Sequence, residues 1–135
     1  MEATGLGDAG SPSWSVRAAA GRRLATSAER PEATGTLLRL LLDAYDSGVT
    51  QNTARALLDR GDTTGLRLVL GALARATETS TADQLSAELD CDPRWTTDAG
   101  SEQLIGQLEE LACDDDTGVR SEAQTVLRSL RPLDD

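Results

Sequence analysis

The stretch Asp114–Leu130, DDDTGVRSEAQTVLRSL, has the pattern of a capped amphipathic helix. Three acidic residues stand at its start, where they favour the positive end of the helix dipole and can accept hydrogen bonds from free N–H groups. Val119, Ala123 and Leu127 follow at i, i+4 and i+8, which places them on one face of an α-helix. We therefore predict a helix whose apolar side is buried against a neighbouring element.

The same register occurs twice upstream at nearly constant spacing. Its members are Val16, Ala20 and Leu24 in the first copy, and Val49, Thr53 and Leu57 in the second. The first two valines are 33 residues apart, and the second and third are 70 apart, which is twice 35. Two-helix units that stack on one another repeat at about this length. A helical pattern over residues 81–90 supplies the unit that is missing from the middle of the series.

The motif DDDTGVR at 114–120, followed by Ala123 and Leu127, resembles the second helix of a HEAT repeat. Ser15-Val16-Arg17 carries a second version of it, whereas the middle units lack the Val-Arg pair. The resemblance implies an all-α fold, a right-handed α-solenoid of about three and a half to four HEAT-like helical hairpins. Every basic residue is Arg, and the chain has a single Ile and a single Asn, a bias typical of a GC-rich bacterial genome.

The length of 135 residues fits one domain. We assign residues 13–131 to a single HEAT-like repeat domain, residues 1–12 to a flexible, Gly-rich N-terminus, and residues 132–135 to a C-terminal tail. Stretches rich in Leu at 36–45 and 66–73 are apolar on nearly every side, so these helices should lie between neighbours. Residues 77–81 should be a polar connector, and residues 90–100 should be the longest irregular segment.

The composition argues against most enzyme classes. The chain has no His and no Lys, which removes the commonest general base, the commonest zinc ligand, Schiff-base chemistry and the P-loop lysine. We therefore expect no catalytic residue, no cofactor and no metal, and we assign the acids at 114–116 to helix capping. The catalytic alternative is a lyase-like accessory enzyme acting through Asp43 or Asp46, although no spacing selects a catalytic pair.

The two cysteines, Cys91 and Cys113, form no CxxC pair, and no apolar run has the length of a membrane span or a signal peptide. Cys113 continues an apolar stripe and is predicted to be a small core residue. These features favour a reducing, cytoplasmic setting without a membrane partner.

The net charge of −10 is unevenly distributed. Residues 1–77 carry nine Arg and eight acids, a net charge of +1, whereas residues 78–135 carry four Arg and fifteen acids, a net charge of −11. Because an acidic half repels phosphate, nucleic acid is an unlikely partner, and phosphate or nucleic-acid binding through the N-terminal arginine surface is kept as an alternative.

Arg22 and Arg55 occupy the same register in successive units, 33 residues apart. We predict that they stack on the outward side of the second helices, which the HEAT resemblance implies line a concave surface. Arg17, Gln51 and Asn52 would flank them. The alternative is an ordinary solvated face, with Arg55 balanced by Asp59 one turn away.

Three further residues have two interpretations each. Arg17 and Arg120 directly follow their valines, and in the HEAT family this Arg commonly meets an Asp of a neighbouring turn, so they are ligand contacts or inter-repeat braces. Trp95 lies in a polar segment, where it either fills a gap between units or is exposed for a partner.

These features together predict a non-catalytic protein-binding scaffold or adaptor that uses the concave face of the stacked hairpins. The partner should be a protein with an acidic surface patch. A homodimer through an uncapped end of the stack is a second expectation, since the end of a solenoid exposes apolar surface unless a polar cap covers it.

Overall fold

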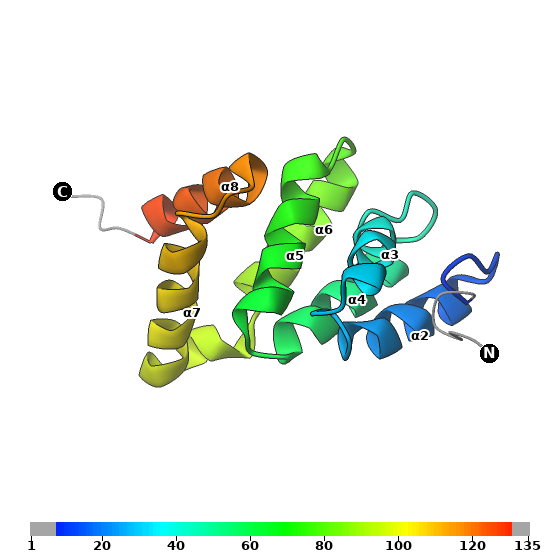
Figure 1. Ribbon diagram of the computed structural model, residues 1–135, viewed down its shortest axis with the longest axis horizontal. Coiled ribbons are helices and arrows are strands. Elements are labelled where there is room, and N and C mark those ends of the chain that lie inside the picture. Colours follow the sequence, from blue (N-terminus) through cyan, green and yellow to red (C-terminus); the bar gives the residue numbers. More distant parts are fainter. Residues whose placement is uncertain (1–7, 131–135) are drawn as a thin grey trace.

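The computed structural model describes residues 8–130, which contain helices and no strand. The helices are α2 (Trp14–Ala25), α3 (Pro31–Leu41), α4 (Ser47–Asp59), α5 (Thr63–Arg75), α6 (Thr79–Asp90), the short 3-10 helix η1 (Pro93–Thr96), α7 (Asp98–Leu111) and α8 (Thr117–Ser129). Figure 1 shows an elongated molecule, with α2 at one end and α7 and α8 at the other. The predicted all-α class is therefore confirmed.

The helices form two rows over most of the molecule. α2 packs mainly against α4, and α4 packs against α6, while α3 packs against α5 (Figure 1). Alternate helices of the chain thus lie next to one another over this part of the molecule.

α8 does not take the place next to α6 that would extend the first row. Its main neighbours are α5 and α7. Two arginines of α5 hold the start of α8 in this position: Arg67 donates to Asp114 at 2.9 Å, and Arg75 donates to Asp116 at 2.9 Å. The last hairpin, formed by α7 and α8, therefore packs against α5.

α5 is the central element of the core. It packs against α3, α4, α6, α7 and α8, and Leu66, Val69 and Leu70 are fully buried. In α3, Leu37 and Leu41 are also fully buried. A helix that is apolar on nearly all sides needs neighbours on all of those sides, and the prediction that these two Leu-rich stretches lie between other helices is confirmed.

Acidic residues cap several helices. Asp46 accepts a hydrogen bond from Gly48 N in α4, Asp62 from Gly65 N in α5, and Asp116 from Val119 N in α8. The capping assignment is thus confirmed for Asp116. Gly61, with φ of 73°, ends α4 in the left-handed conformation that Gly adopts without steric cost.

Two predicted loops are partly helical. α6 begins at Thr79, inside the predicted connector, so that boundary was wrong. The segment 90–100 was predicted to be irregular, yet Pro93–Thr96 is a 3-10 helix and α7 begins at Asp98. Asp92 accepts from Arg94 N and Thr97 accepts from Gly100 N, so local caps start both elements within a segment that has no apolar periodicity.

Two residues predicted to be buried are exposed. Val16 is 36% exposed, because α2 turns Arg17, Ala18 and Ala20 toward its neighbours instead. Cys113, predicted to be in the core, is exposed, because it lies beyond the end of α7, where the buried face finishes at Leu111.

The ends of the predicted domain scheme fall partly outside the described residues, namely residues 1–7 of the N-terminal segment and residues 131–135 at the C-terminus. Within residues 8–12, Ala9 is buried in a small cluster with Ala20, Leu40 and Val49. Among residues 8–130, no helix has both the length and the hydropathy to cross a membrane.

Candidate binding surfaces

Four of the predicted binding residues, Arg22, Gln51, Asn52 and Arg55, lie on α2 and α4, and we call the outward side of α2, α4 and α6 the second-helix face. Arg22 of α2 is exposed and donates from Nη1 to Asn52 Oδ1 of α4 at 2.7 Å. Asn52 in turn donates from Nδ2 to Gly48 O at 2.7 Å, which fixes its amide orientation. Gln51, one residue earlier, is exposed. The structure therefore brings Arg22 and Asn52 together on this face, with Gln51 beside them in the chain.

Arg55 does not act as a second free cation on the second-helix face. Its Nε and Nη2 donate to Glu88 Oε1 of α6 at 3.3 and 3.1 Å. The Glu88 side chain is only 6% exposed, and its other oxygen accepts from Gln84 at 2.9 Å. The alternative interpretation named Asp59 as the balancing acid, whereas the ion pair of Arg55 is with Glu88 on α6. Glu88 was missed because the unit at 81–90 lacks the Val-Arg motif that would align it.

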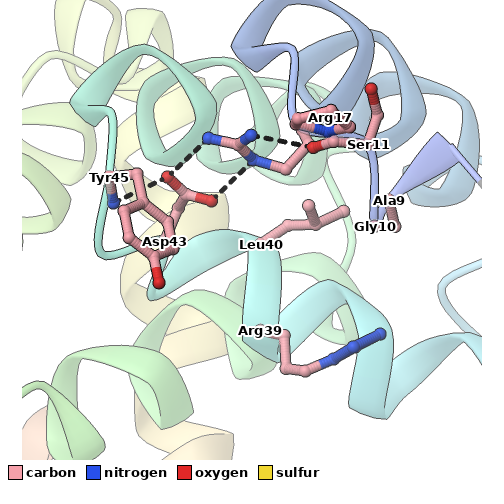
Figure 2. Close-up of a pocket in the computed structure, with 9 residues that line it drawn as sticks. Ala9, Gly10, Ser11, Arg17, Arg39, Leu40, Asp43 and Tyr45 are labelled. Carbon is pink, nitrogen blue, oxygen red and sulfur yellow. Dashed lines mark hydrogen bonds and ion pairs between the residues drawn. The ribbon is translucent and has the colours of Figure 1, made fainter.

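Arg17 is a buried brace between α2 and the end of α3. Its Nε donates to Asp43 Oδ1 at 2.9 Å, Nη2 donates to Oδ2 at 3.2 Å, and Nη1 donates to Ser11 O at 2.9 Å (Figure 2). Both side chains of the ion pair are at most 10% exposed. A bidentate, buried ion pair of this kind leaves Arg17 without a free donor face for a ligand on the surface.

Arg120 repeats part of this arrangement in the last hairpin. It donates from Nη1 to Asp114 O at 2.8 Å, reaching six residues back, as Arg17 does to Ser11. The brace interpretation therefore fits Arg17, which joins α2 to Asp43, whereas the contact that Arg120 makes among the described residues stays in the loop ahead of its own helix. The two versions of the motif place the Arg alike, even though α8 and α2 have different neighbours.

The two acids named for the catalytic alternative are engaged in structural contacts. Besides the Arg17 pair, Asp43 Oδ2 accepts from Tyr45 N at 3.1 Å and Asp46 N at 2.8 Å. Asp46 Oδ1 accepts from Gly48 N at 2.7 Å. Both carboxylates thus hold the loop between α3 and α4.

A hollow of about 550 Å³ lies beside this loop. Its walls come from residues 9–12, from Arg17 and Asp43, and from Arg39, Leu40 and Tyr45 (Figure 2). Tyr45 is 89% exposed. We call this site the Tyr45 hollow. Sequence reasoning missed it, because it forms where residues 9–12, ahead of α2, meet the end of α3, and no periodic pattern links these segments.

Trp95 belongs to η1, which packs against α7. It is partly buried, packs against the main core cluster and donates from Nε1 to Leu89 O at 3.0 Å. These contacts support the interpretation of Trp95 as a gap filler between α6 and α7, and the structure does not bring it together with Arg22 or Arg55.

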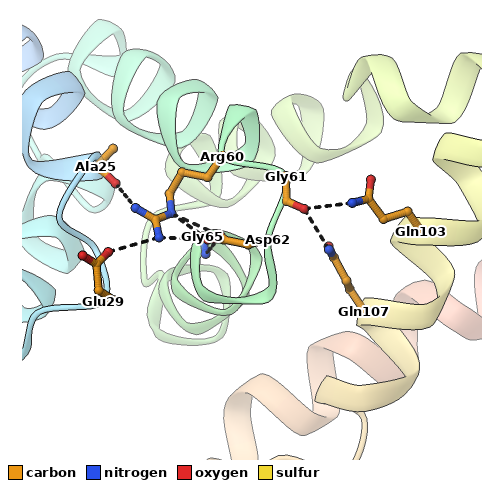
Figure 3. A network of polar contacts seen from close by, with 8 residues as sticks. All are labelled: Ala25, Glu29, Arg60, Gly61, Asp62, Gly65, Gln103 and Gln107. Carbon is orange, nitrogen blue, oxygen red and sulfur yellow. Dashed lines mark hydrogen bonds and ion pairs between the residues drawn. The ribbon is translucent and has the colours of Figure 1, made fainter.

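A polar network joins the loops at the other edge of the hairpins (Figure 3). Arg60 donates to Ala25 O at 2.7 Å, to Glu29 at 3.1 Å and to Asp62 at 2.8 Å. The hydrogen bond from Arg60 lowers the pKa of Asp62, and the same bond raises the pKa of Arg60. Gly61 O accepts from Gln107 of α7 at 2.9 Å. The network connects the end of α2, the junction between α4 and α5, and α7, and it is structural in character.

Metal-binding geometry is not found in the described part of the chain: no group of three or more Cys, Asp or Glu side chains there could hold an ion. Comparison of the sequence with models of protein families, of the chain with curated proteins, and of the fold with solved structures finds no match in any of the three. The candidate surfaces are therefore interpreted from their own chemistry.

Proposed function

We propose that this protein is a non-catalytic protein-binding module, an α-solenoid of HEAT-like hairpins that binds a partner through the second-helix face. The observation that carries the proposal is the row of α2, α4 and α6, in which Arg22 of α2 meets Asn52 of α4 and the exposed Gln51 precedes Asn52 in the chain. A row of parallel helices offers a broad surface rather than an enclosed pocket, and such a surface suits a macromolecular partner.

The charge of the second-helix face defines the chemistry of the partner. Arg22 is exposed, and within residues 8–130 its side-chain partner is the neutral amide of Asn52. Arg55 is 46% exposed at the side chain, but Glu88 compensates its charge. The face therefore offers one uncompensated cation surrounded by amide groups. It suits a carboxylate of the partner at Arg22 and hydrogen-bonding groups at Gln51 and Asn52.

The ion pairs that the N-terminal arginines form within the chain disfavour nucleic acid as the partner. Arg17, Arg23 and Arg55 each form an ion pair with a carboxylate of this chain. Nucleic acid binding depends on several arginines that neutralise successive phosphates. Most of the N-terminal arginines would have to break existing ion pairs to do so.

The proposal is tested with full-length bait protein, chemical crosslinking and mass spectrometry in lysate of the source cell. The variant Arg22→Glu should lose a partner that the wild-type bait retains, because like charges at an interface repel the acidic patch. Arg128→Glu, an equal charge reversal at an exposed site on α8, should keep that partner. Circular dichroism should show the same helicity for both variants.

A nuclease arm separates the alternatives. If the partner is a protein, nuclease treatment leaves it bound to the wild-type bait. Loss of all partners with nuclease would instead support nucleic acid. Equal recovery of every partner by wild type and Arg22→Glu would remove the second-helix face from the proposal.

A further inference from the structure

The Tyr45 hollow has a fixed wall on one side. Asp43 accepts four hydrogen bonds, two from Arg17 and one each from the backbone N–H groups of Tyr45 and Asp46. Because Asp43 is anchored to a buried arginine, the loop that carries Tyr45 is held in one conformation. An exposed aromatic side chain on a fixed loop can contact a partner with little loss of conformational entropy.

The remainder of the hollow combines an apolar surface with a cation. Pro12 contributes an exposed apolar group, Ala9 and Leu40 line the hollow from the buried side, and Arg39 lies next to Leu40 on α3. In Figure 2 the side chains of Arg39 and Leu40 extend to the right, and Tyr45 lies to the left of Leu40. The hollow is therefore bordered by the Tyr45 ring on one side and the Arg39 guanidinium on the other.

Arg39 gives the hollow its net charge. The Arg17 and Asp43 charges compensate each other within the wall. Arg39 is exposed, and its contact within residues 8–130 is a hydrogen bond of 3.4 Å to Thr36 Oγ1 in its own helix. Its remaining donors are available for an anion, and a guanidinium binds a carboxylate in a bidentate manner.

We infer that the Tyr45 hollow binds an acidic peptide segment of a protein partner, with an aliphatic side chain against the exposed Tyr45 ring and a carboxylate on Arg39. The single cation matches one carboxylate and not a run of phosphates. Tyr45 is 89% exposed, so a peptide can reach its ring directly from solvent. Tyr and Arg are the residue types most often found at the energetic centre of protein interfaces.

This inference concerns a different surface from the second-helix face, and the two can fail separately. Arg22 and Arg39 lie on different helices, and neither residue contributes to the site of the other. A partner lost from Arg22→Glu bait says nothing about the hollow. The experiment below uses defined peptides and does not depend on the natural partner.

The test is a two-dimensional ¹H–¹⁵N NMR titration of the full chain with two synthetic peptides. The probe is acetyl-Leu-Asp-Glu-Leu-amide, and its neutral counterpart is acetyl-Leu-Asn-Gln-Leu-amide. We expect the acidic peptide to shift the amide signals of Ser11, Leu40 and Tyr45 in a saturable manner. The neutral peptide should bind about tenfold more weakly, as expected when one charge-assisted hydrogen bond is lost.

Two matched variants identify the residue responsible. Arg39→Gln should reduce binding of the acidic peptide to the level of the neutral one. Arg128→Gln is the control, because Arg128 is also exposed and also donates to a Thr hydroxyl three residues earlier. It should bind the acidic peptide as the wild type does.

Several results would overturn the inference. They are the absence of saturable shifts at millimolar acidic peptide, equal affinity for the two peptides, and shifts centred on the second-helix face rather than on the hollow. Equal losses in Arg39→Gln and Arg128→Gln would show that the peptide responds to the overall charge of the protein and not to this site.

Discussion

The hydroxyl of Thr53 is a polar group in an apolar part of the core. Thr53 is fully buried where α4 crosses α2, and its Oγ1 has no hydrogen-bond partner among the described residues. Gly21 faces it from α2 so closely that a methyl group at Gly21 would overlap Oγ1. The close approach of these helices thus depends on a small residue on one side and carries an unsatisfied donor on the other.

We predict that Thr53→Val stabilises the protein. Valine has the same shape, and removing an unsatisfied buried hydroxyl should raise the free energy of unfolding by about 1 kcal/mol. Thermal denaturation should therefore show a higher Tm. Thr53→Ala is the control, since it removes the hydroxyl but also removes a packed methyl group and leaves a void. A Tm for Thr53→Val at or below that of the wild type would show that the hydroxyl is satisfied.

Asp116 supplies a pH-dependent contribution at the start of α8. Hydrogen bonds from Arg75 and from Val119 N lower the pKa of Asp116 from 3.8 to about 2. Because the pKa is lower in the folded protein than in the unfolded chain, the ionised carboxylate stabilises the fold above about pH 4. This stabilisation is lost as the pH falls from about 4 to about 2.

We predict that Asp116→Asn lowers the Tm at pH 7 and flattens the fall in Tm between pH 4 and pH 2. Asn keeps an oxygen that can accept from Val119 N, so the difference reports the charge. Arg75 is 48% exposed, so the effect should be modest. Asp115→Asn is the control, because Asp115 is exposed and makes no hydrogen bond with the described residues. Parallel Tm curves for the wild type and Asp116→Asn would contradict this assignment.

At the scale of the elements, α8 is the helix that closes the stack. Val119 is 2% exposed and lies against α5, near Gly71. Ser121, two residues later, is exposed. The register predicted from the apolar spacing is therefore confirmed at the start of α8, whereas Leu127, near its end, is only partly buried.

We predict that Val119→Asp unfolds the last hairpin and that Ser121→Asp has little effect. An unpaired charge at a buried site costs several kcal/mol, a large part of the roughly 5 to 15 kcal/mol that stabilises a domain. Circular dichroism melts of the two variants provide the measurement. Equal Tm values would show that Val119 does not face the core.

Sequence periodicity predicted the helices better than the segments between them. Repeated apolar spacing identifies a helix because burial requires one continuous face, and α2, α4 and α8 were found in this way. The helix η1 depends instead on the capping residue Asp92 and on Pro93, and α6 begins at Thr79 without a side-chain cap, so neither start leaves a periodic pattern. The burial of Val16 was predicted wrongly because α2 buries the neighbouring Arg17 instead. Arg17 is buried because it pairs with Asp43, a residue 26 positions away that the spacing of apolar residues does not reveal.

The candidate sites were predictable to a similar, limited extent. The period of 33 residues identified Arg22 and Arg55 as related positions on one face. It could not reveal Glu88, which changes the charge of that face, because the partner of an ion pair is set by packing between helices. The Tyr45 hollow required the fold itself, since its residues come from the segment ahead of α2, from α2, and from the end of α3 with the loop that follows it.

At the scale of the whole molecule, ion pairs connect the N-terminal half of the sequence to its strongly acidic C-terminal half. Arg67 and Arg75 belong to the N-terminal part with a net charge of +1, and their partners Asp114 and Asp116 belong to the part with a net charge of −11. The hydrogen bond from Arg67 lowers the pKa of Asp114, and the bond to Asp114 raises the pKa of Arg67. Some of the acidic excess therefore stabilises the closing hairpin.

The opposite end of the molecule exposes apolar side chains. Trp14 is 49% exposed and Val16 is 36% exposed, both in the first turn of α2. We predict that the protein self-associates weakly through this end, because pairing two such ends removes apolar surface from water. Sedimentation velocity should show a sedimentation coefficient that rises with concentration.

Val16→Glu should return the protein to a monomer without changing its Tm, since Val16 is outside the core and two acidic side chains at a symmetric contact repel each other. Ser121→Glu on α8 is the matched control, an exposed acidic substitution at the other end of the molecule, and it should leave self-association unchanged. A wild-type protein that remains monomeric up to millimolar concentration would refute the prediction. If both variants lost association equally, the cause would be the added negative charge. A contact through the α2 end would be disrupted by the substitution of Val16 and not by that of Ser121.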